Sequence, residues 1–244
     1  MLVYMTKLIY LEQMDQYACA GQVVDVQLDG DWVVVILDQT IFYPQGGGQP
    51  YDTGVITSSD GRKFLVEEVR FVDGVVRHIG KFDDDAFEVG DSVTCAVDVP
   101  RRQLHARLHS AGHVVDMALK RLGVPWVPGK GYHFPDGPYV EYAGDLSSFD
   151  KEKLRGDLES MCNQILGEGI ATKVLFMNRE EMLSMCAFVP EQLPANKPGR
   201  VVMYGDFGVP CGGTHVAKFA DIGRLVIRKM KQEREHVKVS YAVA

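Results

Sequence analysis

Apolar and polar residues follow two different periods along this chain. From Gly21 to Asp98, short runs rich in Val and Ile are interrupted by Asp29-Gly30 and Asp73-Gly74. Such runs, separated by Asp-Gly pairs, predict short strands joined by tight turns. The predicted strands are VVDVQL, DWVVVILD, TIFY, FLVEEVRFV, VVRHIG and SVTCAVDV. Several short strands at this spacing predict a small antiparallel β-barrel.

Over residues 98–123 the apolar residues recur with the period of an α-helix. Apolar side chains recur every three or four positions and predict one buried helix face; they are Leu104, Leu108, Ala111, Val115, Ala118 and Leu122. Pro100 suits the first turn of a helix, and Gly123 suits its end.

The rest of the chain mixes both periods. A second helix is predicted over 150–167, and a short one after Asn178, which forms a capping-box pattern with Glu181. Residues 188–199, with three prolines, predict a loop. The predicted strands are PYVEY, TKVLFM, VVMYGDF and a closing hairpin, GRLVIRKMK to HVKVSYAV. The predicted fold class is therefore α+β, with a β-barrel over residues 1–97 and, over residues 98–244, helices packed on a largely antiparallel sheet.

Two pairs of residues have the spacing of metal ligands. His109 and His113 are four residues apart on the predicted helix, so their imidazoles project in nearly the same direction. Cys211 and His215 are also four apart. Each pair has an ordinary alternative, since paired histidines are common in helices and a buried cysteine often packs as a small hydrophobe. Together the nitrogen and sulfur atoms suit one Zn²⁺ per chain. His105, one turn earlier, is expected at the surface.

A glycine-rich loop lies between Pro44 and Pro50. Gly46, Gly47 and Gly48 are expected where the backbone takes positive φ or approaches another group closely, and the flanking prolines restrict the loop. We expect its amides and Gln49 to form the rim of a substrate pocket. An ordinary turn of the barrel is the alternative.

Several of these segments together resemble a known family. LHSAGHVVD at 108–116, CGGTHV at 211–216 and FYPQGGGQPYDTG at 42–54 resemble the editing domain of alanyl-tRNA synthetase and its free-standing relatives, the AlaX-type trans-editing proteins. PYVEY at 138–142 and VKVSYAV at 237–243 are weaker matches. The resemblance runs from about residue 20 to the end. The editing domain of threonyl-tRNA synthetase shares the two-pair metal pattern, but CGGTH favours the alanyl branch.

The resemblance implies a zinc-dependent hydrolase that deacylates tRNA(Ala) carrying the wrong amino acid, mainly serine and secondarily glycine. It implies His109, His113, Cys211 and His215 as zinc ligands. It also implies substrate contacts from Gly46, Gly47, Gly48, Gln49 and Thr214. Four protein ligands are typical of a structural zinc, so a catalytic role stays open. The alternatives are editing of another aminoacyl-tRNA of the threonyl type, hydrolysis of small esters or amides, and tRNA binding without catalysis.

The distribution of charge indicates which part of the chain binds tRNA, and the cysteine content indicates a cellular compartment. The net charge is −7, but residues 1–99 hold 6 Lys and Arg against 17 Asp and Glu, and residues 100–244 hold 20 against 16. The positive second part is the expected tRNA-binding part, with Arg228, Lys229 and Lys231 in its densest cluster; a solvated surface is the alternative. Five scattered cysteines favour reduced thiols and a cytoplasmic protein. No stretch has the pattern of a signal peptide, a membrane span or an aminoacylation domain.

Overall fold

The computed structural model describes residues 5–83, 85–186, 188–189 and 198–244. It divides into two compact units, one formed by Met1–Gly46 and Pro50–Gln103, the other by Gly47–Gln49 and Leu104–Ala244. Three residues of the glycine-rich loop therefore belong to the second unit, although their sequence neighbours belong to the first. Most of the loop predicted over 188–199 lies outside the described residues.

The first unit contains a closed six-stranded barrel with the strand order β2-β3-β7-β6-β5-β8. Every neighbouring pair is antiparallel, which confirms the barrel predicted from sequence. Buried apolar side chains fill its interior, among them Val35, Ile56 and Phe64. The strands are β2 (Ala18–Asp29), β3 (Trp32–Leu37), β5 (Gly54–Ser58), β6 (Lys63–Val72), β7 (Val75–Phe82) and β8 (Ser92–Val97).

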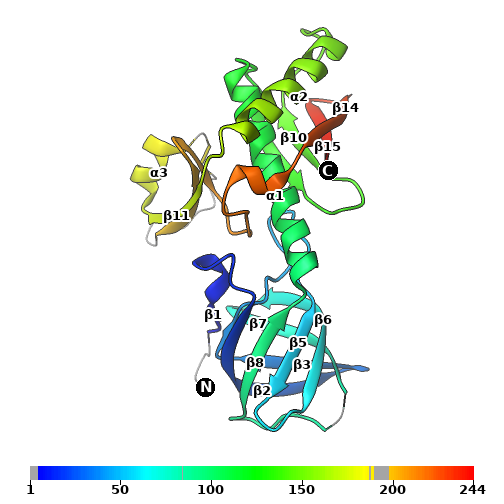
Figure 1. Ribbon diagram of the computed structural model, residues 1–244, viewed down its shortest axis with the longest axis vertical. Helices are drawn as coiled ribbons and strands as arrows, with labels where there is room; N and C mark the ends of the chain where they lie inside the picture. Colours follow the sequence, from blue (N-terminus) through cyan, green and yellow to red (C-terminus); the bar gives the residue numbers. More distant parts are fainter. Residues whose placement is uncertain (1–4, 84, 187, 190–197) are drawn as a thin grey trace. The chain divides into compact units, whose positions relative to one another are not determined.

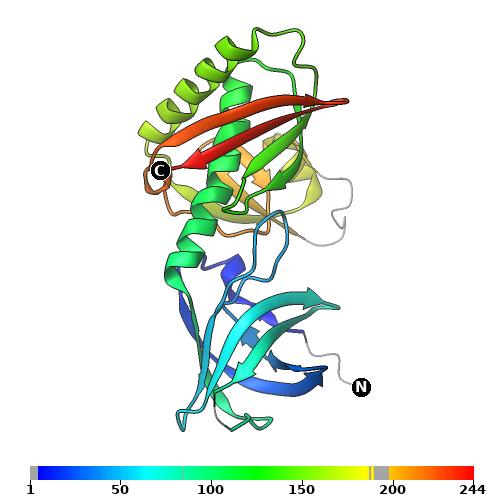
Figure 2. The same cartoon turned by 90° about the vertical axis from the view of Figure 1, so that its right-hand side faces the viewer.

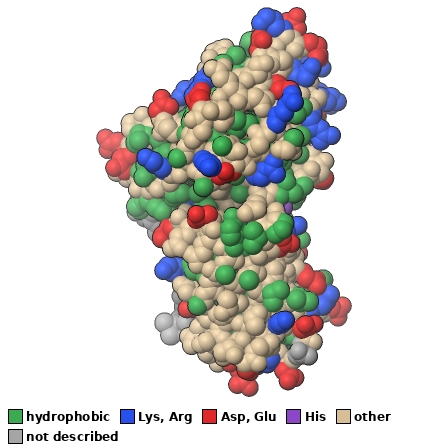
Figure 3. Space-filling model, viewed as in Figure 1, with side chains coloured by type: hydrophobic (Ala, Val, Ile, Leu, Met, Phe, Trp, Pro, Cys, Tyr) green, Lys and Arg blue, Asp and Glu red, His purple; other side chains and the backbone are tan. Residues whose placement is uncertain are grey.

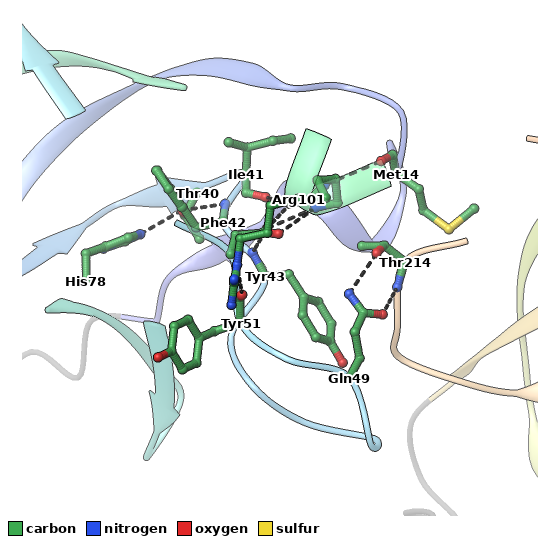
Figure 4. Close-up of polar contacts among 12 residues, drawn as sticks. Met14, Thr40, Ile41, Phe42, Tyr43, Gln49, Tyr51, His78, Arg101 and Thr214 are labelled. Atoms are coloured by element: carbon green, nitrogen blue, oxygen red, sulfur yellow. Dashed lines mark hydrogen bonds and ion pairs between the residues drawn. The ribbon is translucent and has the colours of Figure 1, made fainter. Parts of the chain in front are cut away.

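Within the barrel, one strand of the sequence prediction is wrong, and the strand β5 was not predicted. Only the first residue of the TIFY segment is in a strand, the two-residue β4 (Gln39–Thr40). This strand pairs in parallel with β1 (Lys7–Leu8), which lies just before the 3-10 turn η1 (Ile9–Leu11). The amides of Phe42 and Tyr43 donate instead to the Thr40 hydroxyl at 3.1 Å and the Asp52 carboxylate at 2.7 Å (Figure 4). These side-chain acceptors take the hydrogen bonds that pairing with a neighbouring strand would otherwise use. The sixth strand of the barrel is β5.

The second unit is built around α1 (Val99–Arg121), which contributes its residues from Leu104 onward. This helix lies against one face of a four-stranded antiparallel sheet with the order β14-β15-β10-β9, and α2 (Lys151–Gly167) also packs there (Figure 2). The strands are β9 (Val127–Tyr132), β10 (Tyr139–Ala143), β14 (Leu225–Glu233) and β15 (His236–Val243). Helices on an antiparallel sheet are the arrangement predicted from sequence.

A second, three-stranded sheet completes this unit, with the order β11-β12-β13. It consists of β11 (Thr172–Met177), β12 (Gly199–Tyr204) and β13 (Phe207–Pro210), with α3 (Arg179–Met185) beside it and the 3-10 turn η2 (Phe219–Ile222) following. The predicted capping box of α3 is present, since Asn178 and Glu181 bond reciprocally. None of the described helices is long and apolar enough to cross a membrane.

Candidate metal centre and substrate cavity

The four predicted metal ligands come together in the second unit. His109 and His113 are on α1, and Cys211 and His215 are on the segment that follows β13. One ligand atom from each residue can be chosen so that all four lie within 4.8 Å of one another. The three histidines are buried, whereas Cys211 is partly exposed. A helix and a turn about a hundred residues apart in sequence thus supply one compact set of nitrogen and sulfur donors.

Each histidine of this cluster uses its Nδ1 atom for a contact outside the cluster. His109 Nδ1 lies 2.8 Å from Gln49 Oε1, and His215 Nδ1 lies 3.0 Å from the Tyr204 hydroxyl. His113 Nδ1 lies 3.3 Å from a carboxylate oxygen of Asp116. Histidines that bind a metal through Nε2 commonly donate the other ring N–H in this way.

The opposite ring nitrogens are suited to bind a metal ion. Among the described residues, the Nε2 atoms of His113 and His215 are buried and have no hydrogen-bond partner. The third Nε2 atom, that of His109, lies 3.4 Å from Cys211 Sγ. Leaving buried polar atoms unsatisfied costs free energy, and one ion would satisfy all of them. Three imidazole nitrogens and one thiolate fit tetrahedral Zn²⁺.

The electrostatics of the cluster keep two of its imidazoles neutral and lower the pKa of its thiol. Burial lowers the pKa of His109 and of His215 well below 6.5, and the neighbouring His113 charge lowers both further, so both rings are neutral. For His113, burial is outweighed by Asp116 and Cys211, which raise its pKa to about 9. Burial would raise the pKa of Cys211, but His113 outweighs that effect and lowers it. The thiol therefore loses its proton readily, as a zinc ligand must.

The Cys-Gly-Gly-Thr-His turn needs a glycine at position 213. A Cβ atom added there would lie 2.2 Å from the His109 ring and 3.0 Å from Gln49 Oε1. The neighbouring Thr214 is held by Gln49, whose Oε1 accepts from the Thr214 amide at 3.0 Å and whose Nε2 lies 2.8 Å from the Thr214 hydroxyl (Figure 4). Gln49 and Thr214 are both fully buried. They support the cluster from within the protein.

A cavity of about 410 Å³ opens beside the cluster. Its wall includes His109, His113 and Cys211, together with Gly47 and Gly48 of the glycine-rich loop. Of the residues expected to contact substrate, only these two glycines are in the cavity wall; Gly46, Gln49 and Thr214 are not part of it.

Gly48 explains why the loop is glycine-rich. Its φ is +76°, and a Cβ atom there would lie 2.2 Å from the carbonyl oxygen of Gly131 on β9. The Gly48 carbonyl also accepts a hydrogen bond from the His133 amide at 2.8 Å. The loop is therefore fixed against the cavity wall by close backbone contact, which only glycine permits.

His133 is a cavity residue to which the sequence pattern gave no special role. Its ring stacks on His109, with the centroids 4.3 Å apart and an angle of 20° between the planes. Its Nδ1 lies 2.6 Å from the Tyr241 hydroxyl, which itself donates to the Leu108 carbonyl at 2.9 Å. Because the hydroxyl proton is used there, Nδ1 must carry the proton of the neutral imidazole, and Nε2 is left as an acceptor.

Burial and the His113 charge lower the pKa of His133 to about 3, which keeps the ring neutral. No spacing rule could identify this residue, because its neighbours come from three distant segments. His105 was predicted at the surface, but it is 1% exposed, because α1 also buries the face that carries His109.

The three predicted tRNA-binding residues lie on β14. Arg228, Lys229 and Lys231 are all exposed.

Comparison with known proteins identifies the family. Residues 6–101 match the family model described as tRNA synthetases class II (A). The alanine–tRNA ligase of Methanothrix thermoacetophila is 35% identical over 83% of this chain and 22% of the ligase. The alanyl-tRNA editing protein AlaX-L of Pyrococcus horikoshii is 29% identical over 95% of this chain and 55% of that protein. The chain thus spans about half or less of these two relatives. The alanyl-tRNA editing protein AlaX-M of Saccharolobus solfataricus is 31% identical over 94% of both chains. The chain belongs to the AlaX-type alanyl-tRNA editing proteins.

Proposed function

We propose that this protein is a trans-editing hydrolase that cleaves the ester bond of tRNA(Ala) carrying the wrong amino acid, mainly serine and secondarily glycine. The observation that supports this most directly is the three-histidine, one-cysteine cluster in the wall of a cavity, in a chain of the AlaX type. We place the protein in the cytoplasm, which agrees with its five free cysteines.

In this proposal His109, His113, Cys211 and His215 hold one Zn²⁺, and Gln49 and Asp116 orient two of the imidazoles. The ion would supply Lewis acidity for the ester or for an attacking water. Because it joins segments about a hundred residues apart, it would also stabilise the native state.

The cavity wall offers a way to distinguish serine from alanine. His133 presents Nε2 as a hydrogen-bond acceptor without a partner among the described residues, and the serine hydroxyl can donate to it. An alanyl group would cover this nitrogen and leave it unsatisfied. Stranding a buried polar atom costs about 1–3 kcal/mol, which corresponds to a rate roughly ten- to a hundredfold lower for alanine.

The RNA part of the substrate would meet the exposed cations of β14. Arg228, Lys229 and Lys231 are on β14, and Lys and Arg side chains gather in the part of the molecule that contains α2, β14 and β15 (Figure 3). Cations on one surface attract a polyanion and release its counterions.

Deacylation assays test the proposal. Without ATP, the protein should release serine from tRNA(Ala) at least tenfold faster than alanine. His109→Ala should abolish the reaction, whereas His236→Ala, which removes an exposed histidine of β15, should not. His133→Asn should slow release of serine more than release of glycine. Equal rates on seryl- and alanyl-tRNA(Ala), or full activity of His109→Ala, would refute the proposal.

Two further substrates distinguish the alternatives. Faster hydrolysis of seryl-tRNA(Thr) than of seryl-tRNA(Ala) would assign the protein to the threonyl type of editing. Hydrolysis of free serine esters as fast as of seryl-tRNA(Ala) would indicate a small-ester hydrolase. Binding of tRNA without hydrolysis of any of these would indicate a binding module.

A further inference from the structure

The outer face of the four-stranded sheet carries a stack of aromatic rings. The rings of Tyr139 and Tyr132 are 5.2 Å apart at an angle of 18°, and those of Tyr132 and Phe134 are 4.4 Å apart at 12°. Lys238 Nζ lies 3.5 Å from the Tyr139 ring centroid and covers that end of the stack. The order is therefore Lys238, Tyr139, Tyr132, Phe134. All three rings are partly exposed.

This face is opposite the one that packs on the helices. Successive side chains of a strand point to opposite faces. Along β10, Val140 and Tyr142 are buried in the core, so Tyr139, which precedes Val140, faces outward. Tyr132 on β9 is directly opposite Tyr139 and shares that face. The far end of the stack is Phe134, for which the described residues show no ring contact except that with Tyr132. A planar group could continue the stack at Phe134.

Cations lie next to this stack. Lys231 of β14 is directly opposite Lys238 of β15, and on its other side Lys238 is directly opposite Glu141 of β10. Lys231 has an ion pair with Glu233, at 2.9 Å, but both side chains are about half exposed and such pairs contribute little. Lys130 of β9 is also exposed. These lysines can pair with the phosphates of a bound polyanion.

The stack is continuous with the cavity through one short segment. Gly131 and His133 line the cavity, whereas Tyr132 and Phe134 alternate with them and belong to the stack. The strand that carries this segment, β9, is at the edge of the sheet. A chain whose last residue occupies the cavity can therefore pass over β9 and reach Phe134 directly.

Planar rings flanked by lysines are how proteins bind single-stranded nucleic acid, with bases on the rings and phosphates at the cations. A protein partner would instead favour a surface with few lysines. We propose that Tyr132, Phe134, Tyr139 and Lys238 bind the unpaired nucleotides next to the aminoacylated 3′ end of the tRNA, with a base stacked on Phe134. This inference rests on the proposed function, because the cavity must hold the terminal aminoacyl nucleotide.

Two measurements test whether Tyr132, Phe134, Tyr139 and Lys238 form such a platform for nucleotides. The first is binding of a fluorescent single-stranded RNA with the 3′ sequence of tRNA(Ala) to the full chain. Phe134→Ala should weaken binding roughly ten- to a hundredfold, the range for loss of one stacked base, whereas Phe134→Tyr should preserve it. Lys238→Gln should reduce the slope of log affinity against log salt by about 0.7, as expected for one lost phosphate contact to a single strand. Phe176→Ala, which removes a half-exposed ring on β11, is the matched control and should leave binding unchanged.

The second measurement is deacylation of seryl-tRNA(Ala) beside that of a seryl ester of adenosine, which has no neighbouring nucleotides. Phe134→Ala should raise KM for the tRNA and leave hydrolysis of the adenosine ester unchanged. Equal RNA affinity of wild type and Phe134→Ala, or equal binding of single-stranded and duplex RNA, would overturn the platform. If the wild type hydrolyses neither ester, the proposed function is wrong. The RNA-binding measurement still tests the nucleotide-binding platform in that case.

Discussion

Replacing Gln49 by alanine should lower both the affinity for zinc and the free energy of unfolding of the second unit. This one side chain connects the glycine-rich loop to a metal ligand and to the CGGTH turn. Its Oε1 accepts from His109 Nδ1 and from the Thr214 amide, and its Nε2 donates to the Thr214 hydroxyl. The variant leaves two buried donors and one buried acceptor without partners. Each costs about 1–3 kcal/mol, reduced where water enters the space left by the side chain.

The effect on the metal can be predicted separately. Without Gln49, the His109 ring has no partner that keeps its proton on Nδ1 and its Nε2 free for zinc. Loss of such an outer partner typically lowers metal affinity 10- to 100-fold, which corresponds to about 1.4–2.7 kcal/mol. By linkage, the zinc-loaded variant should lose that much more stability than the metal-free variant.

The assay combines competition against a chromophoric zinc chelator with urea unfolding of the zinc-loaded and metal-free proteins. Gln45→Ala is the matched control, because Gln45 is an exposed glutamine in the same loop. Gln49→Glu should retain more affinity than Gln49→Ala, since a carboxylate can still accept from His109 and from the Thr214 amide. Unchanged zinc affinity in Gln49→Ala, with stability lost equally in both forms, would show that Gln49 only packs the loop and would refute the reasoning.

Two further predictions concern the metal and the barrel. The purified protein should contain about one zinc per chain, and the Cys211→Ala, His215→Ala double variant should lose it; full occupancy of that variant by elemental analysis would disprove the ligand assignment. In the barrel, burial lowers the pKa of His78 from 6.5 to about 4, so between these pH values the folded state keeps the neutral ring that bonds to Val35 and Thr40, whereas the unfolded chain binds a proton there. The free energy of unfolding should therefore include the full contribution of His78 above pH 6.5 and fall by about 3 kcal/mol as the pH decreases to 4. Trp32 fluorescence in a Trp126→Phe background can follow this loss, and a flat profile would contradict it.

The sequence by itself determined the features that depend on neighbouring residues. A spacing of four on a helix places His109 and His113 on one face whatever surrounds them, and the capping box of Asn178 and Glu181 is equally local. Asp29-Gly30 and Asp73-Gly74 marked two hairpins of the barrel, because Gly and Asp tolerate the positive φ that such turns need. The family could be inferred from short motifs for the same reason.

Tertiary structure decided what depends on distant partners. The TIFY segment has the composition of a strand, but the Asp52 carboxylate takes the amide of Tyr43 that a ladder would have used. Gln49 was expected at the rim of the pocket, yet its partners are 60 and 165 residues away and hold it in the interior. His133 became a defined hydrogen-bond acceptor only because Tyr241, 108 residues later, fixes its tautomer. Local spacing specifies which side chains share a face, whereas hydrogen bonding between segments far apart in sequence determines which of their atoms remain free to bind a ligand.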